Sequence, residues 1–360
     1  MKQKKGRLAR AAGIAIVLAL MILAATGILE SYLNRRDSLA AENPFDFDAY
    51  SDNLYLRVGD GLLVASDVRL ELFDGEGREL SSLSRNFPDV ICAVSGDYGL
   101  AYSQSGNTAC VLGPEGVYHD LTLPGSILGG DVAENGSSVF LTEEQGFKGS
   151  VTVYNEAGEG SYRVYLGDGY PLDADVSRDG EDVAVLAMNG AGSRVSVYTM
   201  DREEVAAQWD GGDTLYFELE YLEGGGMLLL STGDAVFLNG KGGLLSSFSF
   251  EGEYLKDFAL GDGLVTLVLG KYRTGSAGRV VNLDESGNIL GTLDVTAEVE
   301  GLSASQQRLC VRFSDRTAVY DKNLELLGSL DSTAGILASL MRSDGNALIV
   351  SGGGAAIFEP

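Results

Sequence analysis

The chain has 360 residues, with 52 acidic residues against 26 basic ones and a net charge of −26 at pH 7. Five of the basic residues precede residue 11, and without them 21 basic residues face 52 acidic ones, a net charge of −31. A body this acidic repels nucleic acid and anionic lipid surfaces, which argues against both as its partners.

The N-terminus carries a basic stretch, Lys2–Arg10, followed by nineteen uncharged residues, Ala11–Leu29. Nineteen residues are long enough for a helix to cross a bilayer core, and the preceding positive charges favour a cytoplasmic N-terminus. We therefore expect residues 1–10 to be a cytoplasmic tail, residues 11–29 a single-pass transmembrane helix, and residues 30–44 a linker. The rest of the chain is then displayed on the outer side of the cell membrane. The alternative is a cleaved signal peptide, since small residues at 24–27 could form a cleavage site.

From residue 45 onward, a block of roughly forty residues recurs eight times. Each block contains a short strand, a tight turn with glycine, a very apolar strand, a loop, a third strand, a second turn and a last strand. The apolar second strands are Leu62–Ala65, Leu100–Tyr102, Val139–Leu141, Val183–Ala187, Met227–Leu230, Leu264–Leu269, Leu309–Phe313 and Ala347–Val350. Four strands per unit at this period predict an all-β domain over residues 45–360, a β-propeller with eight four-stranded blades. Seven blades are the alternative, because the first and last units are the least regular.

The phase of the repeat predicts how the ring closes. The last repeat stops after its third strand, at Phe358, and so lacks an outer strand. Phe45–Tyr50 alternates apolar and polar residues as an edge strand does, and we expect it to pair beside Ala355–Phe358. The same phase places the tight turns on one face of the propeller and the longer loops on the other.

Two hairpins carry a resemblance to known propellers. Asp175–Gly180 followed by Val183–Leu186 resembles the S-x-D-G hairpin of WD40-like and TolB-like bacterial propellers, and Ser343–Gly345 is a weaker copy. The whole layout resembles an uncharacterised family of Firmicutes-type, membrane-anchored bacterial proteins with a degenerate propeller. The resemblance implies the fold and brings no catalytic residue. Trp209 is the only tryptophan, so the tryptophan-bearing repeat typical of quinone-cofactor propellers is missing.

Residues for catalysis or metal binding are scarce. His119 is the only histidine, which excludes multi-histidine metal centres and most histidine-based triads. The acidic run from Asp173 to Asp179 lacks the glycine and the final glutamate of an EF-hand loop. The three cysteines form no C-x-x-C pair, and we expect them to be reduced. We therefore expect no catalytic residue, no cofactor and no metal site.

The long-loop side offers the one candidate binding site. Function concentrates in loops held by a rigid scaffold, and three of the loops here exceed what hairpin closure requires. The candidate residues are Phe147, Tyr170, Lys271, Tyr272, Arg273 and Arg279. Their basic and aromatic character predicts a contact with an acidic protein or a cell-wall polymer, against the plainer interpretation of a solvated loop. The favoured function is a binding or scaffolding module, and the alternative is a cell-envelope glycan hydrolase or lyase that uses paired carboxylates.

Overall fold

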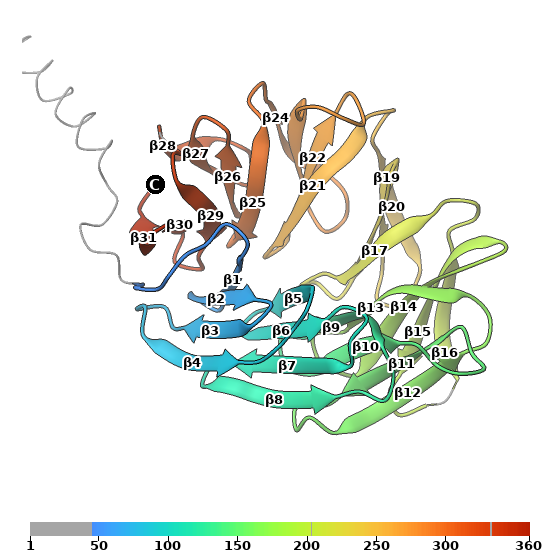
Figure 1. Cartoon of the computed structure of the whole chain (residues 1–360). Helices are drawn as coiled ribbons and strands as arrows, with labels where there is room; N and C mark the ends of the chain where they lie inside the picture. The colour runs from blue at the N-terminus through green and yellow to red at the C-terminus, as the bar shows by residue number, and fades with distance from the viewer. Residues whose placement is uncertain (1–44, 203, 332) are drawn as a thin grey trace, which may run out of the picture. The chain divides into compact units, whose positions relative to one another are not determined.

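The computed structural model of the chain describes residues 45–202, 204–331 and 333–360. These residues belong to one compact unit, Glu42–Pro360, and their strands form eight antiparallel sheets. The sheets follow one another around a common centre, so the colour in Figure 1 runs once around a ring. The ring is an eight-bladed β-propeller, and the prediction of eight blades rather than seven is confirmed. We number the blades 1 to 8 in chain order.

Each blade presents its first strand, strand a, to the centre of the ring, and its later strands lie further out (Figure 1). The a strands are β1 (Leu54–Val58), β5 (Val90–Ser95), β9 (Ile127–Val132), β13 (Tyr170–Val176), β17 (Tyr216–Tyr221), β21 (Tyr254–Gly261), β25 (Val299–Ser305) and β29 (Ile336–Met341). The b strands are β2 (Gly61–Ser66), β6 (Tyr98–Ser103), β10 (Ser138–Thr142), β14 (Asp182–Asn189), β18 (Met227–Ser231), β22 (Leu264–Gly270), β26 (Arg308–Phe313) and β30 (Ala347–Ser351). The c strands are β3 (Arg69–Phe73), β7 (Thr108–Gly113), β11 (Gly149–Tyr154), β15 (Gly192–Thr199), β19 (Asp234–Leu238), β23 (Arg279–Leu283), β27 (Thr317–Asp321) and β31 (Gly354–Phe358). The outer d strands are β4 (Glu79–Ser84), β8 (Gly116–Thr122), β12 (Gly160–Leu166), β16 (Val205–Asp210), β20 (Leu244–Ser249), β24 (Ile289–Asp294) and β28 (Leu326–Leu330).

The b strands are apolar because both of their faces pack against neighbouring blades. Every residue of β18 and of β22 is buried. Apolar side chains of adjacent blades form shared cores, as where Val139, Val151 and Val183 pack together between blades 3 and 4. The outer strand β20 instead has exposed and half-buried residues, as a strand with one solvated face does.

The turns between the c and d strands follow the expected Asp/Asn-x-x-Gly chemistry. The Asp284 carboxylate accepts the backbone N–H groups of Ser286 and Asn288, both at 2.9 Å. Gly287 completes this turn with a φ of 78°, a left-handed value that favours glycine. We call the side of the ring that carries the a–b and c–d turns the tight-turn face, and the side that carries the b–c and d–a connections the long-loop face.

The ring is closed by the start of the propeller domain. Blade 8 has three strands, and Phe45 pairs with Ala355 of β31 in a single antiparallel bridge, with the Ala355 N–H donating to the Phe45 carbonyl at 3.1 Å. The expected strand over residues 45–50 is thus reduced to one bridged residue, because the antiparallel direction carries the residues after Phe45 towards the β30–β31 turn. Phe47 instead packs on Phe73 of blade 1, with ring centroids 5.4 Å apart. Gly354 permits this approach, since a Cβ there would lie 2.1 Å from the Phe45 carbonyl oxygen.

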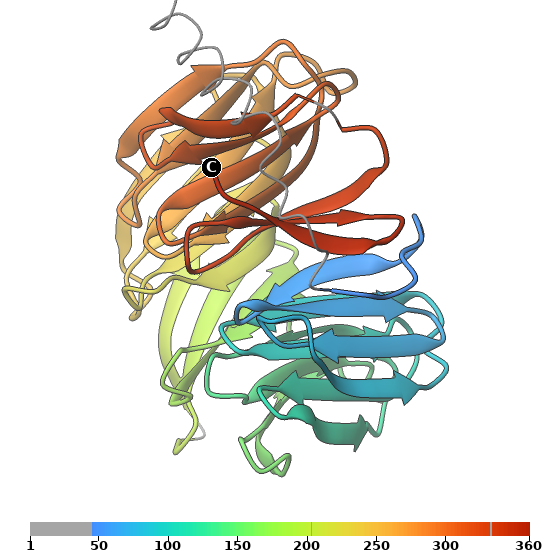
Figure 2. The same cartoon turned by 90° about the vertical axis from the view of Figure 1, so that its left-hand side faces the viewer.

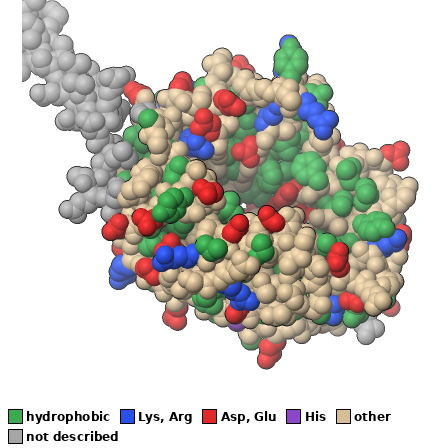
Figure 3. All heavy atoms as spheres, viewed as in Figure 1, with side chains coloured by type: hydrophobic (Ala, Val, Ile, Leu, Met, Phe, Trp, Pro, Cys, Tyr) green, Lys and Arg blue, Asp and Glu red, His purple; other side chains and the backbone are tan. Residues whose placement is uncertain are grey.

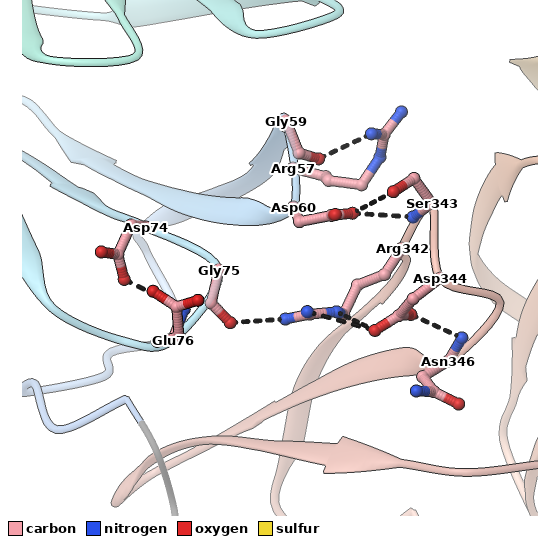
Figure 4. A network of polar contacts seen from close by, with 10 residues as sticks. All are labelled: Arg57, Gly59, Asp60, Asp74, Gly75, Glu76, Arg342, Ser343, Asp344 and Asn346. Atoms are coloured by element: carbon pink, nitrogen blue, oxygen red, sulfur yellow. Dashed lines mark hydrogen bonds and ion pairs between the residues drawn. The ribbon is translucent and has the colours of Figure 1, made fainter.

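A second link joins blades 8 and 1 on the tight-turn face, and Figures 1 and 2 show these blades side by side. The Asp60 carboxylate accepts the backbone N–H of Ser343 at 2.9 Å and its hydroxyl at 2.6 Å (Figure 4). Arg342 donates to the Gly75 carbonyl at 3.0 Å. Burial alone would raise the pKa of Asp60, but the hydrogen bonds from Ser343, together with the positive charges of Arg342 and Arg57, hold that pKa below its usual value.

The expected tail, transmembrane helix and linker, residues 1–10, 11–29 and 30–44, lie outside the described residues. Within the described ranges, no helix is long and apolar enough to span a membrane. Cys92, Cys110 and Cys310 are free thiols, as expected. Burial raises the pKa of Cys310 to about 12, so this thiol is unreactive at neutral pH.

Candidate functional site

The six candidate binding residues all lie on the long-loop face, in two separate groups. Phe147 lies in the β10–β11 loop of blade 3, and Tyr170 begins β13 of blade 4. Lys271, Tyr272 and Arg273 lie in the β22–β23 loop of blade 6, and Arg279 begins β23. Blade 5 stands between the two groups.

The blade 6 group exposes two cations and one aromatic ring. Tyr272 is 66% exposed, and the Lys271 ammonium lies 5.7 Å from the centre of its ring. The Lys256 ammonium donates to the Arg273 carbonyl at 2.9 Å and so fixes the loop. Arg279 differs from the others, because its guanidinium forms a half-buried ion pair with Glu253 at 2.6 Å. Lys271 and Arg273 are therefore the cations that a partner could reach, and Arg279 is a structural residue of the blade.

The group on blades 3 and 4 is an aromatic surface. The Phe147 ring lies 5.0 Å from that of Tyr165, whose face is covered by the Arg163 guanidinium at 5.0 Å. The Lys148 ammonium lies 4.6 Å from the Tyr170 ring centre and donates to the Tyr170 hydroxyl at 3.1 Å. These cation–π contacts hold the rings at the surface.

Exposed apolar side chains continue between the two groups. Met188 pairs with Tyr170 across β13 and β14, Phe217 occupies a β-bulge in β17, and Tyr254 begins β21 of blade 6. All of these are exposed, as is Leu215 just before β17. The long-loop face of blades 3 to 6 therefore carries an apolar belt. Phe217 was not predicted from the sequence, because a bulge moves one residue out of the strand alternation.

Five carboxyl groups line the centre of the ring on three consecutive a strands. They belong to Asp131 of β9, Asp173 and Asp175 of β13, and Glu218 and Glu220 of β17. Asp131, Asp175 and Glu220 lie at a cavity of about 420 Å³, together with residues of the a–b turns. Figure 3 shows a hollow at the centre of the face it draws, with hydrophobic side chains around it and acidic ones at its edge.

Asp175 is buried and the other four carboxyl groups are partly buried, and the loss of solvent around them raises their pKa values. The pKa of Asp131 rises to about 6 and that of Asp173 to about 8. The pKa values of Asp175 and Glu220 rise well above their usual range, through burial and then through the negative charge of Asp131. The group therefore retains protons at pH values where ordinary carboxyl groups are ionised.

The first function of these carboxyl groups is structural. Asp173 accepts the Leu219 N–H at 2.8 Å, and Asp175 accepts the Tyr221 N–H at 2.6 Å. Both acceptors lie in blade 4 and both donors in blade 5. Strand a is the edge strand of its sheet, so the backbone N–H groups on its unpaired edge have no partner in a neighbouring strand. In β17 the carboxyl groups of Asp173 and Asp175 accept two of these N–H groups.

Three of these carboxyl groups converge. Ligand oxygens of Asp131, Asp175 and Glu220 all lie within 4.8 Å of one another. Oxygens arranged in this way can share protons or hold a small cation.

The carboxyl cluster was missed from the sequence, although a signal was present. Asp173-x-Asp175 and Glu218-x-Glu220 occupy strand a in two successive repeats, where side chains two apart share one side of the strand. Acidic pairs at the same place in adjacent repeats mark side chains that converge at the centre of the ring.

The fold defines the class of this protein: it is an eight-bladed β-propeller, and its fold is similar to those of WD40 domains and BamB. The C-terminal WD40 domain of Sif2 is 15% identical with a TM-score of 0.63, and the match covers 89% of this chain and 98% of that one. BamB from Moraxella catarrhalis is 12% identical with a TM-score of 0.55, over 88% of this chain and 98% of that one. Sqt1 from Chaetomium thermophilum, bound to the N-terminus of ribosomal protein L10, is 13% identical with a TM-score of 0.57, over 89% and 100% of the two chains. Similarity at these identities shows the fold alone.

The chain belongs to a family of unknown function, DUF5711, whose model matches residues 36–352. No curated protein matches the sequence.

Proposed function

We propose that this chain is a binding or scaffolding module, anchored in a bacterial cell membrane by residues 11–29, that displays its propeller on the outer side. Its partner is a protein or an envelope polymer that docks on the long-loop face. The apolar belt over blades 3 to 6 carries this proposal, because exposed apolar patches on a soluble domain mark interaction sites. Lys271 and Arg273 add positive charge at one end of the belt and favour an acidic partner. The Sqt1 structure shows a propeller of similar fold holding a protein segment.

Site-specific photo-crosslinking in native membranes tests the docking face. A photoreactive phenylalanine analogue at Tyr272 is expected to give a discrete adduct, since that ring is at the end of the apolar belt. The same analogue at Leu244, an exposed residue of the outer strand β20, is the matched control and should give none. Replacing Lys271 and Arg273 with serine should weaken the Tyr272 adduct and reduce its salt dependence, without a change in melting temperature. Arg279 is left unchanged, because removing it would break the ion pair with Glu253. Equal adducts at both positions, or an adduct unaffected by the double replacement, would contradict this docking face.

The topology is tested independently by protease added to intact cells after removal of the wall. We expect the propeller to be degraded without lysis, because the basic residues before residue 11 favour a cytoplasmic N-terminus. Protection until the membrane is lysed would show the opposite orientation, and release of the propeller into the medium would show a cleaved signal peptide.

A further inference from the structure

The outer strands of three consecutive blades, 5, 6 and 7, carry exposed aliphatic side chains at one end (Figure 1). An outer strand begins directly after the turn between strands c and d, so the first residues of β20, β24 and β28 lie at the tight-turn end of the ring. These strands start with aliphatic residues that are between 41% and 60% exposed. We call them the outer-edge patch: Leu244, Leu245, Ile289, Leu326 and Leu327.

The surroundings of the outer-edge patch are poor in negative charge. Asp294, at the long-loop end of β24, is the only charged residue in the three strands. In the turns before these strands, the carboxylates of Asp284 and Asp321 accept backbone N–H groups of their own turns. The half-buried Glu285 accepts the Gly224 N–H at 2.9 Å. The exposed charges that remain in the three turns belong to Lys241, Lys322 and Glu325.

The chain enters the ring next to this patch. Phe45 takes the place of the missing outer strand of blade 8, and its bridge to Ala355 is antiparallel, so the chain reaches Phe45 from the tight-turn end. Blades 7 and 8 touch here, since a Cβ at Gly328 of β28 would lie 2.6 Å from the Cα of Pro360. A tether that precedes Phe45 therefore leaves the ring at the same end as the outer-edge patch and one blade away from it.

The proposed membrane anchor brings a bilayer close to this end of the ring. Residues 30–44 are fifteen residues, which span at most about 50 Å when fully extended. A bilayer tethered at this distance has a high effective concentration, so a weak apolar contact is enough to hold it. Aliphatic side chains gain free energy on entering the interfacial region, and lysine ammonium groups beside them can reach lipid phosphates. The negative charge of the domain as a whole opposes contact with anionic lipid, and this edge is where that opposition is weakest.

We propose that the outer-edge patch of blades 5 to 7 rests on the surface of the membrane that anchors the chain, with its aliphatic side chains among the lipid head groups. The inference rests on the proposed anchor at residues 11–29. It gives the propeller a fixed orientation, in which the tight-turn end of these blades meets the bilayer and the long-loop face is turned away from it. Lipid then covers Leu244, so the photo-crosslinking control at that position still yields no protein adduct.

Fluorescence quenching in vesicles tests the proposal. The full-length chain carries an environment-sensitive fluorophore at Ile289→Cys and is reconstituted into vesicles of phosphatidylcholine and phosphatidylglycerol, with a nitroxide on the head group of a minor lipid. The natural cysteines do not take the label, because Cys110 and Cys310 are buried and burial raises the pKa of Cys92 to about 12.

The matched control is the same fluorophore at Val117→Cys. Val117 is an exposed aliphatic residue near the start of β8, in blade 2, and blade 2 lies opposite blade 6 in a ring of eight. We expect the nitroxide lipid to quench the Ile289 probe several-fold more strongly than the Val117 probe.

Removing aliphatic side chains from the patch should abolish this difference. With Leu245→Ser and Leu326→Ser, quenching of the Ile289 probe is expected to fall to the level of the Val117 probe. The melting temperature should not change, because both leucines are exposed. Leu80→Ser alters an exposed leucine of the outer strand of blade 1 and should leave the quenching as it is.

Flotation of the vesicles separates this inference from the proposed function. A chain that floats with the vesicles, but whose Ile289 probe is quenched no more than the Val117 probe, overturns the inference and leaves the anchor in place. A blue shift of the Ile289 probe without quenching also overturns it, and shows that a second copy of the chain covers the patch. A chain that does not float contradicts the anchor and this inference together.

Discussion

Replacing Phe45 with alanine is expected to lower the free energy of unfolding of the propeller by about 3–5 kcal/mol. The Phe45 ring is fully buried against Leu62, Val64 and Val350, and it meets Phe73 edge-on at 6.3 Å. The substitution leaves a cavity at the junction where the last blade meets the first. Chemical denaturation followed by tryptophan fluorescence and circular dichroism measures the change.

Tyr50→Ala is the matched control, because that ring belongs to the same segment but is 59% exposed. Its effect should stay within about 0.5 kcal/mol. If both variants are as stable as the natural chain, the ring is closed by the Asp60–Ser343 link alone, and the segment around Phe45 is dispensable.

Replacing Glu220 with glutamine is expected to raise the melting temperature at pH 8 and to change it little at pH 5. Burial, and then the charges of Asp131 and Asp175, raise the pKa of Glu220 well above its usual value. The folded state therefore keeps this proton to a higher pH than the unfolded chain, whose glutamates ionise near pH ~4.3. Stability falls as pH rises through this interval, until the folded group has ionised too. Glutamine cannot ionise, so it removes this loss, and the variant is expected to be more stable than the natural chain at pH 8.

Circular dichroism melting curves between pH 5 and pH 9 provide the measurement. Asp213→Asn changes an exposed carboxylate in the loop before β17 and should leave the pH profile as it is. Part of the slope should remain in Glu220→Gln, since Asp131 and Asp173 have pKa values of about 6 and about 8. A Glu220→Gln protein that is less stable at both ends of the range would show that Glu220 is held as a carboxylate by a bound cation or a partner group.

The blades were predictable from the sequence because the strands and turns of each repeat are specified by residues close together in the chain. A b strand such as Leu264–Gly270 is apolar apart from Thr266 and its final glycine. In the turn Asp284–Gly287 the aspartate side chain accepts backbone N–H groups and the glycine adopts a left-handed φ. Both signals lie within a few residues of sequence, so they can be recognised without knowing how the blades pack against one another. Closure by the segment at Phe45 was predictable for a different reason, because the last repeat lacks an outer strand.

Contacts between residues far apart in the sequence could not be predicted in the same way. The ion pair of Arg279 with Glu253 joins the c strand of blade 6 to the residue before its a strand, and it removes Arg279 from the predicted binding set. The separation of Phe147 and Tyr170 from the blade 6 loop depends on the position of each blade in the ring. The carboxyl cluster depends on which side of three a strands meets the centre, and a bulge near the start of each of these strands shifts that side by a residue.

Asp173 and Asp175 also make the junction between blades 4 and 5 one-sided. Their side chains accept backbone N–H groups of blade 5, and the strand a of any blade offers such groups, whereas only blade 4 supplies the two carboxyl groups. We therefore expect a foreign blade to be tolerated more readily in place of blade 5 than in place of blade 4, because a replacement for blade 4 without these carboxyl groups would leave the N–H groups of Leu219 and Tyr221 without acceptors.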